Sequence, residues 1–521
     1  MKGSNQKVLI VTVLMFVLAV GVFGPVSAQD NVLRVGMDAP VVLDPALGNN
    51  DPETALNRAI YDYLIEVLPD SSIIGNLATS WEISEDGLTY TFTLAEGVTF
   101  HDGSPFSSAD VVFTYNRLKE VESSALSLLG EFEVSAPDAS TVVFTIPEAN
   151  ADFLYGVASR FTLILKDGTA APNVIGEGDS ALASFNGTGP FMLQSLDANV
   201  GGSAVFVKNP NYWKAGQPVL DGLEFIYFPA DAVVQLDAIS SGQVDFIFKV
   251  PFGQVAEGVA EGLNVIEQQT SQHGVIRLRT DVGPGQDVMV RQALKYATNR
   301  DQLNDILLLG SGTVGNNDPI APAYGVFFDD SIEAQPYDPA EACRLLSEAG
   351  YSDGLQMTLY APQAFEYADM ASILQQQWAE ACIQVDIDIR EPGLYYDTSN
   401  DVNYCDVELG ITGWGDRPVP QLFLLEGYVS GAIDEGCLAG FNESHWSDPE
   451  LDALVAEAGV TADTEARAAI YSQIAAIFNE RGPIIVPYFA NMIGVASSRV
   501  QGLEMAPFPG LTDYRNVSVA G

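Results

Sequence analysis

Apolar and polar positions alternate along the first part of the chain with the period of two that is typical of half-buried strands. This pattern occupies residues 32–36, 90–94 and 141–146. Farther along, apolar runs at 223–228 and 244–248 flank residues 232–241, where the apolar side chains share one face of a helix. This order predicts a β-α-β unit with a right-handed crossover.

Helical and strand patterns then alternate through the second half of the chain. Residues 288–309 are helical in pattern, and Asp338 and Pro339 supply the N-cap and first residue of another helix, which Gly350 ends. Further strands and helices are expected at 355–360, 367–381, 383–389, 465–479 and 484–488. Such alternation builds a mostly parallel α/β lobe, so we predict at least two lobes in this chain of 521 residues.

The N-terminus carries the pattern of a secretory signal peptide. Lys2 and Lys7 precede the apolar run 8–23, and small residues at 26–28 form a cleavage site. A membrane anchor is the alternative, but a run of about 16 apolar residues is short for a transmembrane helix. We therefore expect residues 1–28 to be removed, leaving a periplasmic or otherwise extracytoplasmic protein that begins at Gln29.

The charge composition of the chain limits the kinds of molecule that it can bind. The chain has 23 basic and 69 acidic residues and a net charge of -46, so it would repel a nucleic-acid backbone. With 47% hydrophobic and 18% charged residues, the composition is nevertheless that of a globular protein. We exclude nucleic acid as a partner and expect the acidic residues to be spread over a folded surface.

The four cysteines, Cys343, Cys382, Cys405 and Cys437, fall within one third of the chain. In an exported protein they are expected to form disulfides, and four cysteines allow three pairings. We favour Cys343 with Cys382, which lie on two consecutive helices of the predicted pattern, and Cys405 with Cys437, which bracket a loop-rich stretch. The alternative is a zinc site, but the sequence lacks both a C-x-x-C motif and a nearby pair of histidines.

His101, one of three histidines, lies next to Asp102 in a turn and raises the question of a catalytic pair. The turn joins the strand at 90–94 to a helix that Ser107 and Asp110 begin in an S-x-x-D capping pattern, so local structure accounts for the histidine. We interpret it as structural. The sequence has no G-x-S-x-G or H-E-x-x-H motif, which disfavours a secreted hydrolase, and no internal repeat of the kind typical of adhesive surface proteins.

The same region, TFTLAEGVTFHDGSPFSSADV at 91–111, resembles the signature of the family 5 extracellular solute-binding proteins, the peptide- and nickel-binding components of ABC importers. Ala95 replaces a residue that is usually basic in this pattern. Further segments resemble family landmarks in the family's order: VLDPA at 42–46, LATSWE at 77–82, GTGPF at 187–191, NPNYW at 209–213, GQVD at 242–245, VRQALKYA at 290–297 and HWSDPELD at 445–452. Together they extend over nearly the whole chain after the signal peptide.

The resemblance implies an α/β protein with a type II periplasmic-binding-protein fold, in which two lobes joined by a hinge enclose a ligand. It places the large lobe at 29–278 with an extra subdomain at 76–205, the second lobe at 279–484, a return to the large lobe at 485–521, and crossings between lobes at 272–281 and 484–492. A receptor of this kind is not an enzyme and needs no cofactor or metal. Its expected partners are a small-molecule or peptide ligand and the transmembrane subunits of an ABC permease, and we expect a monomer.

Residues 411–421 resemble the segment that binds the ligand in peptide-binding members of the family. Trp414 and Asp416 match it, which implies that Asp416 pairs with the ligand's α-ammonium group while Trp414 forms an apolar wall or a cation-π face. Arg417 and Val419 depart from it, standing where the pattern has an aromatic residue and a second acid. Arg417 could neutralise Asp416 in a loop-stabilising pair, or bind an anionic ligand through two hydrogen bonds.

Two further candidates lie at the expected crossings, His273 in the first and Tyr488 in the second. Each has an ordinary structural alternative, a turn histidine and a core tyrosine, and Trp414 has the alternative of a core aromatic. The predicted ligand is a peptide or similar small solute. The alternatives left open are an anionic opine, a sugar-phosphate-like solute and a metal chelate.

Overall fold

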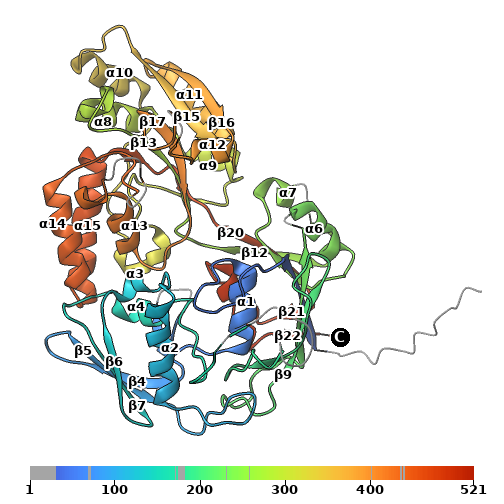
Figure 1. Cartoon of the computed structure of the whole chain (residues 1–521). Helices are drawn as coiled ribbons and strands as arrows, with labels where there is room; N and C mark the ends of the chain where they lie inside the picture. The colour runs from blue at the N-terminus through green and yellow to red at the C-terminus, as the bar shows by residue number, and fades with distance from the viewer. Residues whose placement is uncertain are drawn as a thin grey trace, which may run out of the picture.

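A computed structural model describes residues 31–520 except 69–71, 171, 174–181, 230, 257–258, 400–401, 434–436 and 438–440. The expected signal peptide therefore lies outside the described residues. The chain forms two lobes, the larger at the bottom of Figure 1 and the smaller at the top. No helix within the described ranges is long and apolar enough to cross a membrane.

The large lobe is built on a seven-stranded mixed sheet. Its strand order is β12 (Leu263–Gln268), β20 (Met492–Ser497), β11 (Phe246–Phe248), β1 (Val32–Asp38), β10 (Gly222–Phe228), β9 (Ser203–Lys208) and β8 (Phe191–Leu196). β1 lies between β10 and β11 and runs parallel to both, so the helix α6 (Ala232–Ser240) connects two parallel strands, as predicted. The lobe also contains α1 (Asp51–Ile60), α7 (Phe252–Ala256), β2 (Ile65–Val67), β3 (Ile73–Gly75), β21 (Val500–Gln501) and β22 (Ser518–Val519).

The subdomain of the large lobe has a separate antiparallel sheet. Its order is β4 (Ala78–Ile83), β5 (Thr89–Leu94), β7 (Thr141–Thr145) and β6 (Glu133–Asp138), with helices α2 (Ser108–Glu120), α3 (Leu126–Leu129) and α4 (Phe153–Val157). Ser107 and Asp110 form the predicted capping box at the start of α2. Nε2 of His101 lies 3.0 Å from the carbonyl oxygen of Gly189, in agreement with the structural role inferred for this histidine.

The second lobe is built on another seven-stranded sheet. Its order is β14 (Thr313–Val314), β19 (Tyr488–Phe489), β13 (His273–Leu278), β17 (Leu409–Trp414), β15 (Leu355–Pro362) and β16 (Ile383–Arg390), and β18 (Ile484–Ile485) pairs with β13. β15 is parallel to β16 and β17, but β13 is antiparallel to β17, β18 and β19. The expectation of a mostly parallel lobe is therefore wrong. β13 and β19 adjoin the crossings between lobes and need no helical connection of the kind that parallel strands require.

Helices pack against both faces of this second sheet. They are α8 (Val288–Ala297), α9 (Arg300–Leu307), α10 (Pro339–Glu348), α11 (Tyr367–Glu380), α12 (Pro392–Tyr395), α13 (Pro420–Gly427), α14 (Pro449–Val460) and α15 (Thr464–Arg481). Asp338 caps α10 as predicted. Residues 288–309 form two helices instead of one, because Thr298 is extended and Asn299 caps α9. The strand expected at 484–488 is likewise interrupted before it reaches Tyr488.

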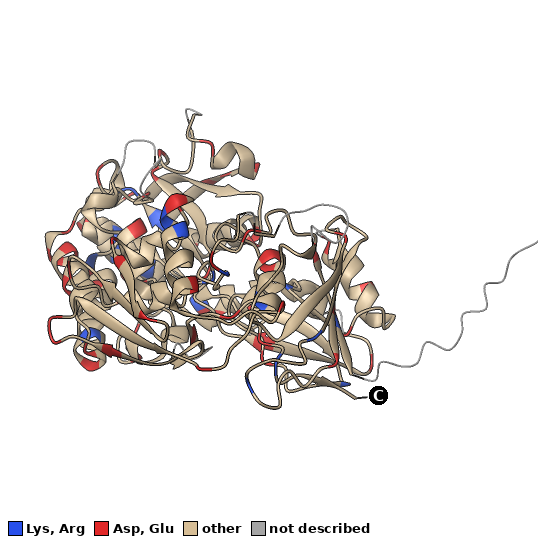
Figure 2. Cartoon of the chain, turned by 60° about the horizontal axis from the view of Figure 1, so that its bottom comes forward, with Lys and Arg blue, Asp and Glu red and all other residues tan. Residues whose placement is uncertain are grey.

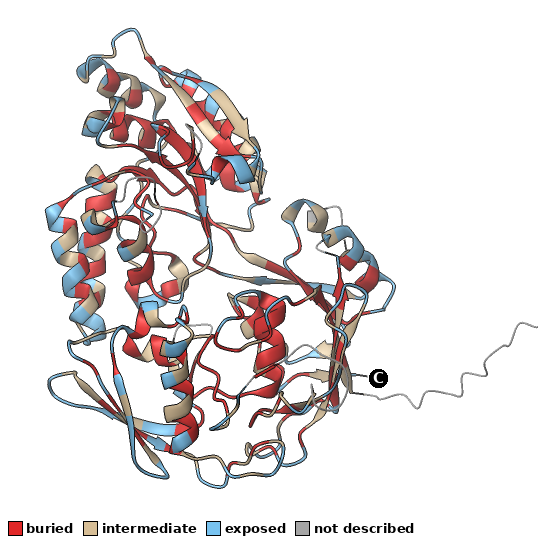
Figure 3. Cartoon of the chain, viewed as in Figure 1, coloured by how far each residue is buried: buried red, intermediate tan, exposed pale blue. Residues whose placement is uncertain are grey.

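The chain passes from the first sheet to the second at 269–272 and returns at 490–491. β13 (His273–Leu278) follows the first crossing and belongs to the second sheet, so the expected end of the large lobe at 278 lies too far along the chain. The two lobes and the subdomain have separate apolar cores, which appear as buried residues in Figure 3. An apolar cluster lies on each face of the second sheet. Ile276 belongs to one cluster and Val275 to the other, so neighbouring side chains of β13 point to opposite faces of the sheet.

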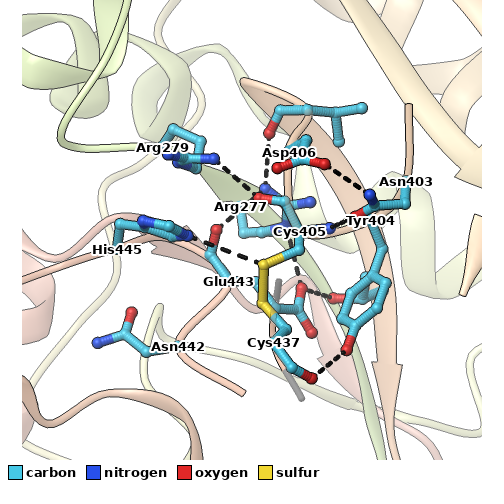
Figure 4. The surroundings of a disulfide bond; sticks show 12 residues. Arg277, Arg279, Asn403, Tyr404, Cys405, Asp406, Cys437, Asn442, Glu443 and His445 are labelled. Atoms are coloured by element: carbon cyan, nitrogen blue, oxygen red, sulfur yellow. Dashed lines mark hydrogen bonds and ion pairs between the residues drawn. A yellow bond between two sulfur atoms is a disulfide. The ribbon is translucent and has the colours of Figure 1, made fainter. Parts of the chain in front are cut away.

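Both disulfides lie in the second lobe and have the pairings favoured from the sequence. Cys343 pairs with Cys382, which ties α10 to the residue before β16. Cys405 pairs with Cys437, as Figure 4 shows. Acidic residues are spread along both lobes, as expected from the composition (Figure 2).

Candidate functional site

The loop after β17 carries the first candidate residues. Trp414 ends β17 and pairs in register with His273 of β13. Trp414 is 8% exposed, and its ring lies edge-on to those of Phe423 and Phe441, so it belongs to the apolar core of the second lobe. The loop at 415–419 then leads into α13. A strand end and a helix start therefore fix the two ends of this short loop.

Asp416 lies in this loop, and one of its two carboxylate oxygens accepts hydrogen bonds from Ser271. Its Oδ1 accepts hydrogen bonds from the backbone N–H and the hydroxyl group of Ser271, at 2.8 and 2.7 Å. Among the described residues, none donates a hydrogen bond to Oδ2. Burial raises the pKa of Asp416, although the hydrogen bonds from Ser271 and the charges of Arg417 and Arg160 act in the opposite direction.

Arg417 is paired with Glu426 of α13 and not with Asp416. Its Nη2 and Nε lie 3.1 and 3.3 Å from Oε2 of Glu426. The guanidinium group also lies 5.7 Å from the ring centroids of both Trp414 and Phe423. The side-chain pair of Asp416 and Arg417 that the sequence left open is therefore not formed.

A cavity of about 470 Å³ contains Asp416 and is lined by both lobes. The second lobe contributes Tyr324, Asp416 and Arg417, and the large lobe contributes Tyr63, Tyr155, Arg160 and Phe508. Tyr324 donates its hydroxyl group to the carbonyl oxygen of Arg417, which helps to hold the loop. We call this space the Asp416 cavity.

Arg160 is a cation of the Asp416 cavity that sequence reasoning missed. It follows α4, and its guanidinium group lies 4.7 and 4.5 Å from the ring centroids of Phe161 and Phe508. Its Nε is buried without a hydrogen-bond partner in the described part of the chain. Burial lowers the pKa of Arg160, and the charge of Arg417 acts in the same direction. No motif surrounds Arg160, so only the fold brings it into the cavity.

Residues 72–435 match the model of the bacterial extracellular solute-binding proteins, family 5 Middle. The chain belongs to this family. The solute-binding protein is 29% identical to heme-binding protein A of Haemophilus influenzae, with 95% of this chain and 93% of the relative aligned. It is 28% identical to the dipeptide-binding protein of Escherichia coli, with 88% and 89% aligned.

The solved structure of HbpA2 from Haemophilus parasuis has a TM-score of 0.81 and 27% identity to the solute-binding protein, covering 94% of this chain and 100% of that chain. The fold is the type II periplasmic-binding-protein fold, as the sequence resemblance implied. The protein is a solute-binding protein of an ABC importer, and the family consists of binding proteins and not of enzymes.

A second cavity of the solute-binding protein, of about 680 Å³, lies along the crossings. Gln272 and Asn491 line it, and its carboxylates include Asp38, Asp231, Glu366 and Asp369. Lys249 also lines this space but is paired with Asp51. The second cavity is therefore more acidic than the Asp416 cavity, whose carboxylates are largely balanced by the three guanidinium groups of Arg58, Arg160 and Arg417.

His273 borders the second cavity and does not line the Asp416 cavity. It is 1% exposed, its Nδ1 lies 2.8 Å from the carbonyl oxygen of Ser271, and its ring contacts those of Phe423 and Phe489. Burial lowers the pKa of His273 to about 4, so the imidazole is neutral near pH 7.

Tyr488 lies inside the second lobe. It is fully buried, and its hydroxyl group donates to Oε1 of Glu366 at 2.7 Å. The structure therefore brings Trp414, Asp416 and Arg417 together in one segment and places Tyr488 outside the Asp416 cavity. Among the candidates from the sequence, Asp416 and Arg417 line the cavity directly.

Cys405, Cys437 and His445 form a group of possible metal ligands, the one such group found among the described residues. Their ligand atoms lie within 4.8 Å of one another, and Nε2 of His445 lies 3.8 Å from Sγ of Cys405 (Figure 4). The two sulfur atoms are joined in a disulfide, however, and the thiolate is the form of cysteine that binds metal. This arrangement gives no support to the zinc site considered from the sequence.

Proposed function

We propose that this protein is an extracytoplasmic receptor that captures a peptide or similar small amine in the Asp416 cavity and delivers it to the permease. The observation that carries the proposal is the carboxylate of Asp416, because Ser271 binds Oδ1 and leaves Oδ2 available. A ligand ammonium group would donate a charge-assisted hydrogen bond to Oδ2. This bond would gain strength as the closing lobes exclude water.

Arg160 supplies the charge that a zwitterionic ligand needs at its other end. The Nη atoms of its planar guanidinium group, of which Nη2 also donates to Oδ1 of Asn49, can donate to a ligand carboxylate. A short peptide carries an ammonium group and a carboxylate at opposite ends. The cavity volume of about 470 Å³ is within the usual range of roughly 300–1,000 Å³ for small-molecule sites.

Two further features support the proposal. The similarity to the dipeptide-binding protein of Escherichia coli favours a peptide ligand. The signal-peptide pattern at 1–28 favours export, after which we expect a monomeric receptor with no enzymatic activity, no cofactor and no nucleic-acid partner.

A pool of free dipeptides and the same pool after N-acetylation test the proposed function. Protein that has been stripped of bound solute is incubated with each pool, and mass spectrometry identifies what is retained. We expect free dipeptides to be retained and acetylated ones to be lost, because acetylation removes the ammonium charge that Asp416 binds. Retention of neither pool would contradict the peptide assignment.

An anionic solute is the second candidate, and the three guanidinium groups that line one cavity, those of Arg58, Arg160 and Arg417, favour it. In that case the carboxylate or phosphate of the ligand would be the dominant recognition group. The acetylated pool should then be retained at least as well as the free pool, since its carboxylate is unchanged.

A further inference from the structure

The subdomain of the large lobe contacts the second lobe at a buried ion pair. Arg467, in the first turns of α15, places Nη2 2.7 Å from Oδ2 of Asp152, the residue before α4. The side chains of Arg467 and Asp152 are 4% and 5% exposed. Figure 1 shows the adjoining ends of α14 and α15 next to the subdomain that carries α3 and α4.

Two further interactions support this ion pair. The guanidinium group of Arg467 lies 5.4 and 5.3 Å from the ring centroids of Phe327 and Tyr471, which hold it in place. The backbone N–H of Ala151 donates to the carbonyl oxygen of Gly459 at 2.8 Å. The subdomain and the second lobe are therefore joined by a side-chain ion pair and by a backbone hydrogen bond.

An apolar cluster of Leu128, Val419 and Leu422 continues the contact toward the Asp416 cavity. Leu128 belongs to α3, whereas Val419 is the last residue of the loop that carries Asp416 and Leu422 lies in α13. Tyr155 of α4 packs against this cluster and also lines the cavity. The interlobe contact and the candidate ligand site therefore share elements from both lobes.

The ion pair is only partly satisfied. Oδ1 of Asp152 and Nε of Arg467 have no hydrogen-bond partner within the described residues. Taking two charges out of water costs free energy, and the attraction within a buried pair often does little more than offset this cost. Water can solvate both groups when the lobes separate. The pair therefore selects one arrangement of the lobes more than it strengthens their attachment.

We propose that Asp152 and Arg467 form a latch, a contact that is made when the lobes close and broken when they open. The latch specifies which arrangement of the lobes is the closed one, and loss of either partner disfavours that arrangement because the remaining charge is buried without its partner. A ligand in the Asp416 cavity touches the same elements, so ligand binding and latch formation favour each other. The latch does not depend on the chemical class of the solute.

The latch can be tested on the ligand-free mature protein by small-angle scattering and hydrogen exchange. Asp152→Asn leaves Arg467 without its charge partner in the closed arrangement. We expect this variant to have a larger radius of gyration than the wild type and roughly tenfold faster exchange at the amide of Ala151. Asp245→Asn is the matched control, because Asp245 is equally buried and pairs with Arg34 inside the large lobe.

Arg467→Gln removes the same pair from the other side and provides a second, independent variant. The double variant Asp152→Asn/Arg467→Gln should open no further than either single variant, since one interaction is lost in all three. The proposal is overturned if both single variants keep the wild-type radius of gyration and exchange at Ala151. It is also overturned if Asp245→Asn opens the protein to the same extent.

Discussion

Ser271 donates both its backbone N–H and its hydroxyl group to one oxygen of Asp416. The donor lies in the first crossing between the lobes, and the acceptor lies in the loop after β17. The backbone that joins the lobes therefore positions the candidate anion. Because the two hydrogen bonds occupy Oδ1, the remaining acceptor capacity of the carboxylate is available to a ligand in the cavity.

Ser271→Ala should weaken the binding of a retained dipeptide by about 1 to 2 kcal/mol, because its hydroxyl group donates to Asp416 and also accepts from the N–H of Arg417 at 2.9 Å. The backbone N–H remains, so Asp416 should stay in the cavity with a less fixed carboxylate. Calorimetric titration measures the change. Ser430→Ala is the control, since its hydroxyl group bonds to Ser447 in an exposed pair. An equal loss of affinity in both variants would refute the positioning role of Ser271.

Asp416→Asn should weaken amine binding by about 2 to 5 kcal/mol with little effect on the fold, because a charge partner is lost from a site that excludes water. Arg417→Ala should have a smaller effect on amine binding. If the solute is anionic, the order of the two effects reverses, since the guanidinium group is then the main donor. Titration of both variants with dipeptides and with a sugar-phosphate or opine pool separates the two cases. Wild-type affinity in both variants would exclude this loop as the binding site.

Glu426→Gln should reduce amine affinity through Arg417. Without the charge of Glu426, the Arg417 guanidinium can turn toward Asp416 and neutralise it. The Arg417 and Glu426 side chains are 30% and 29% exposed, so the effect should not exceed about 1 kcal/mol. In the Arg417→Ala background the same substitution should have no effect, as measured by titration. A loss of affinity that persists in that background would contradict this mechanism.

Asp318 should make stability depend on pH. Burial raises its pKa to about 7, against the hydrogen bond from Ile320 and the charge of Lys295. Its folded pKa is above the unfolded value, so its stabilising contribution is full below about pH 4 and is lost as the pH rises through about 7. The contribution of Asp318 to the free energy of unfolding should therefore fall between pH 5 and 7, by at most about 1.4 kcal/mol per pH unit, while buried His273, whose pKa is lowered, contributes with the opposite sign.

Urea denaturation at pH 5, 6 and 7 measures this slope. Asp318→Asn should make the slope more positive than that of the wild type, because the amide does not titrate and only the contribution of Asp318 is removed. Asp301→Asn, at an exposed position of α9, should leave the slope unchanged. Parallel curves for Asp318→Asn and the wild type would show that Asp318 is not the group responsible.

Local signals in the sequence predicted much of the fold. The cap at Asp338 and the capping box of Ser107 and Asp110 are formed as expected, because each involves residues within one helical turn. The break between α8 and α9 was missed because the apolar pattern continues through it, although Asn299 is a good N-cap. The antiparallel pairing of β13 depends on where the chain returns between lobes, which the periodicity of a strand does not encode.

The candidate site was predicted only where its residues are neighbours in sequence. Trp414, Asp416 and Arg417 follow one strand and could be recognised together. Arg160 comes from the other lobe and has no motif around it, so its place in the cavity follows only from the packing of the lobes. His273 lies on the same face of β13 as Val275, which places its ring in the core on that side of the sheet.

The two crossings are bonded to each other as well as to the lobes. The N–H of Ala490 donates to the carbonyl oxygen of Gln272 at 2.8 Å, and the hydroxyl group of Thr270 donates to the carbonyl oxygen of Ala490 at 2.7 Å. Because these hydrogen bonds join the two crossings, we expect them to bend together, so that the lobes move mainly through one hinge angle. A permease that touches both lobes would need to sense only that angle to distinguish a loaded receptor from an empty one.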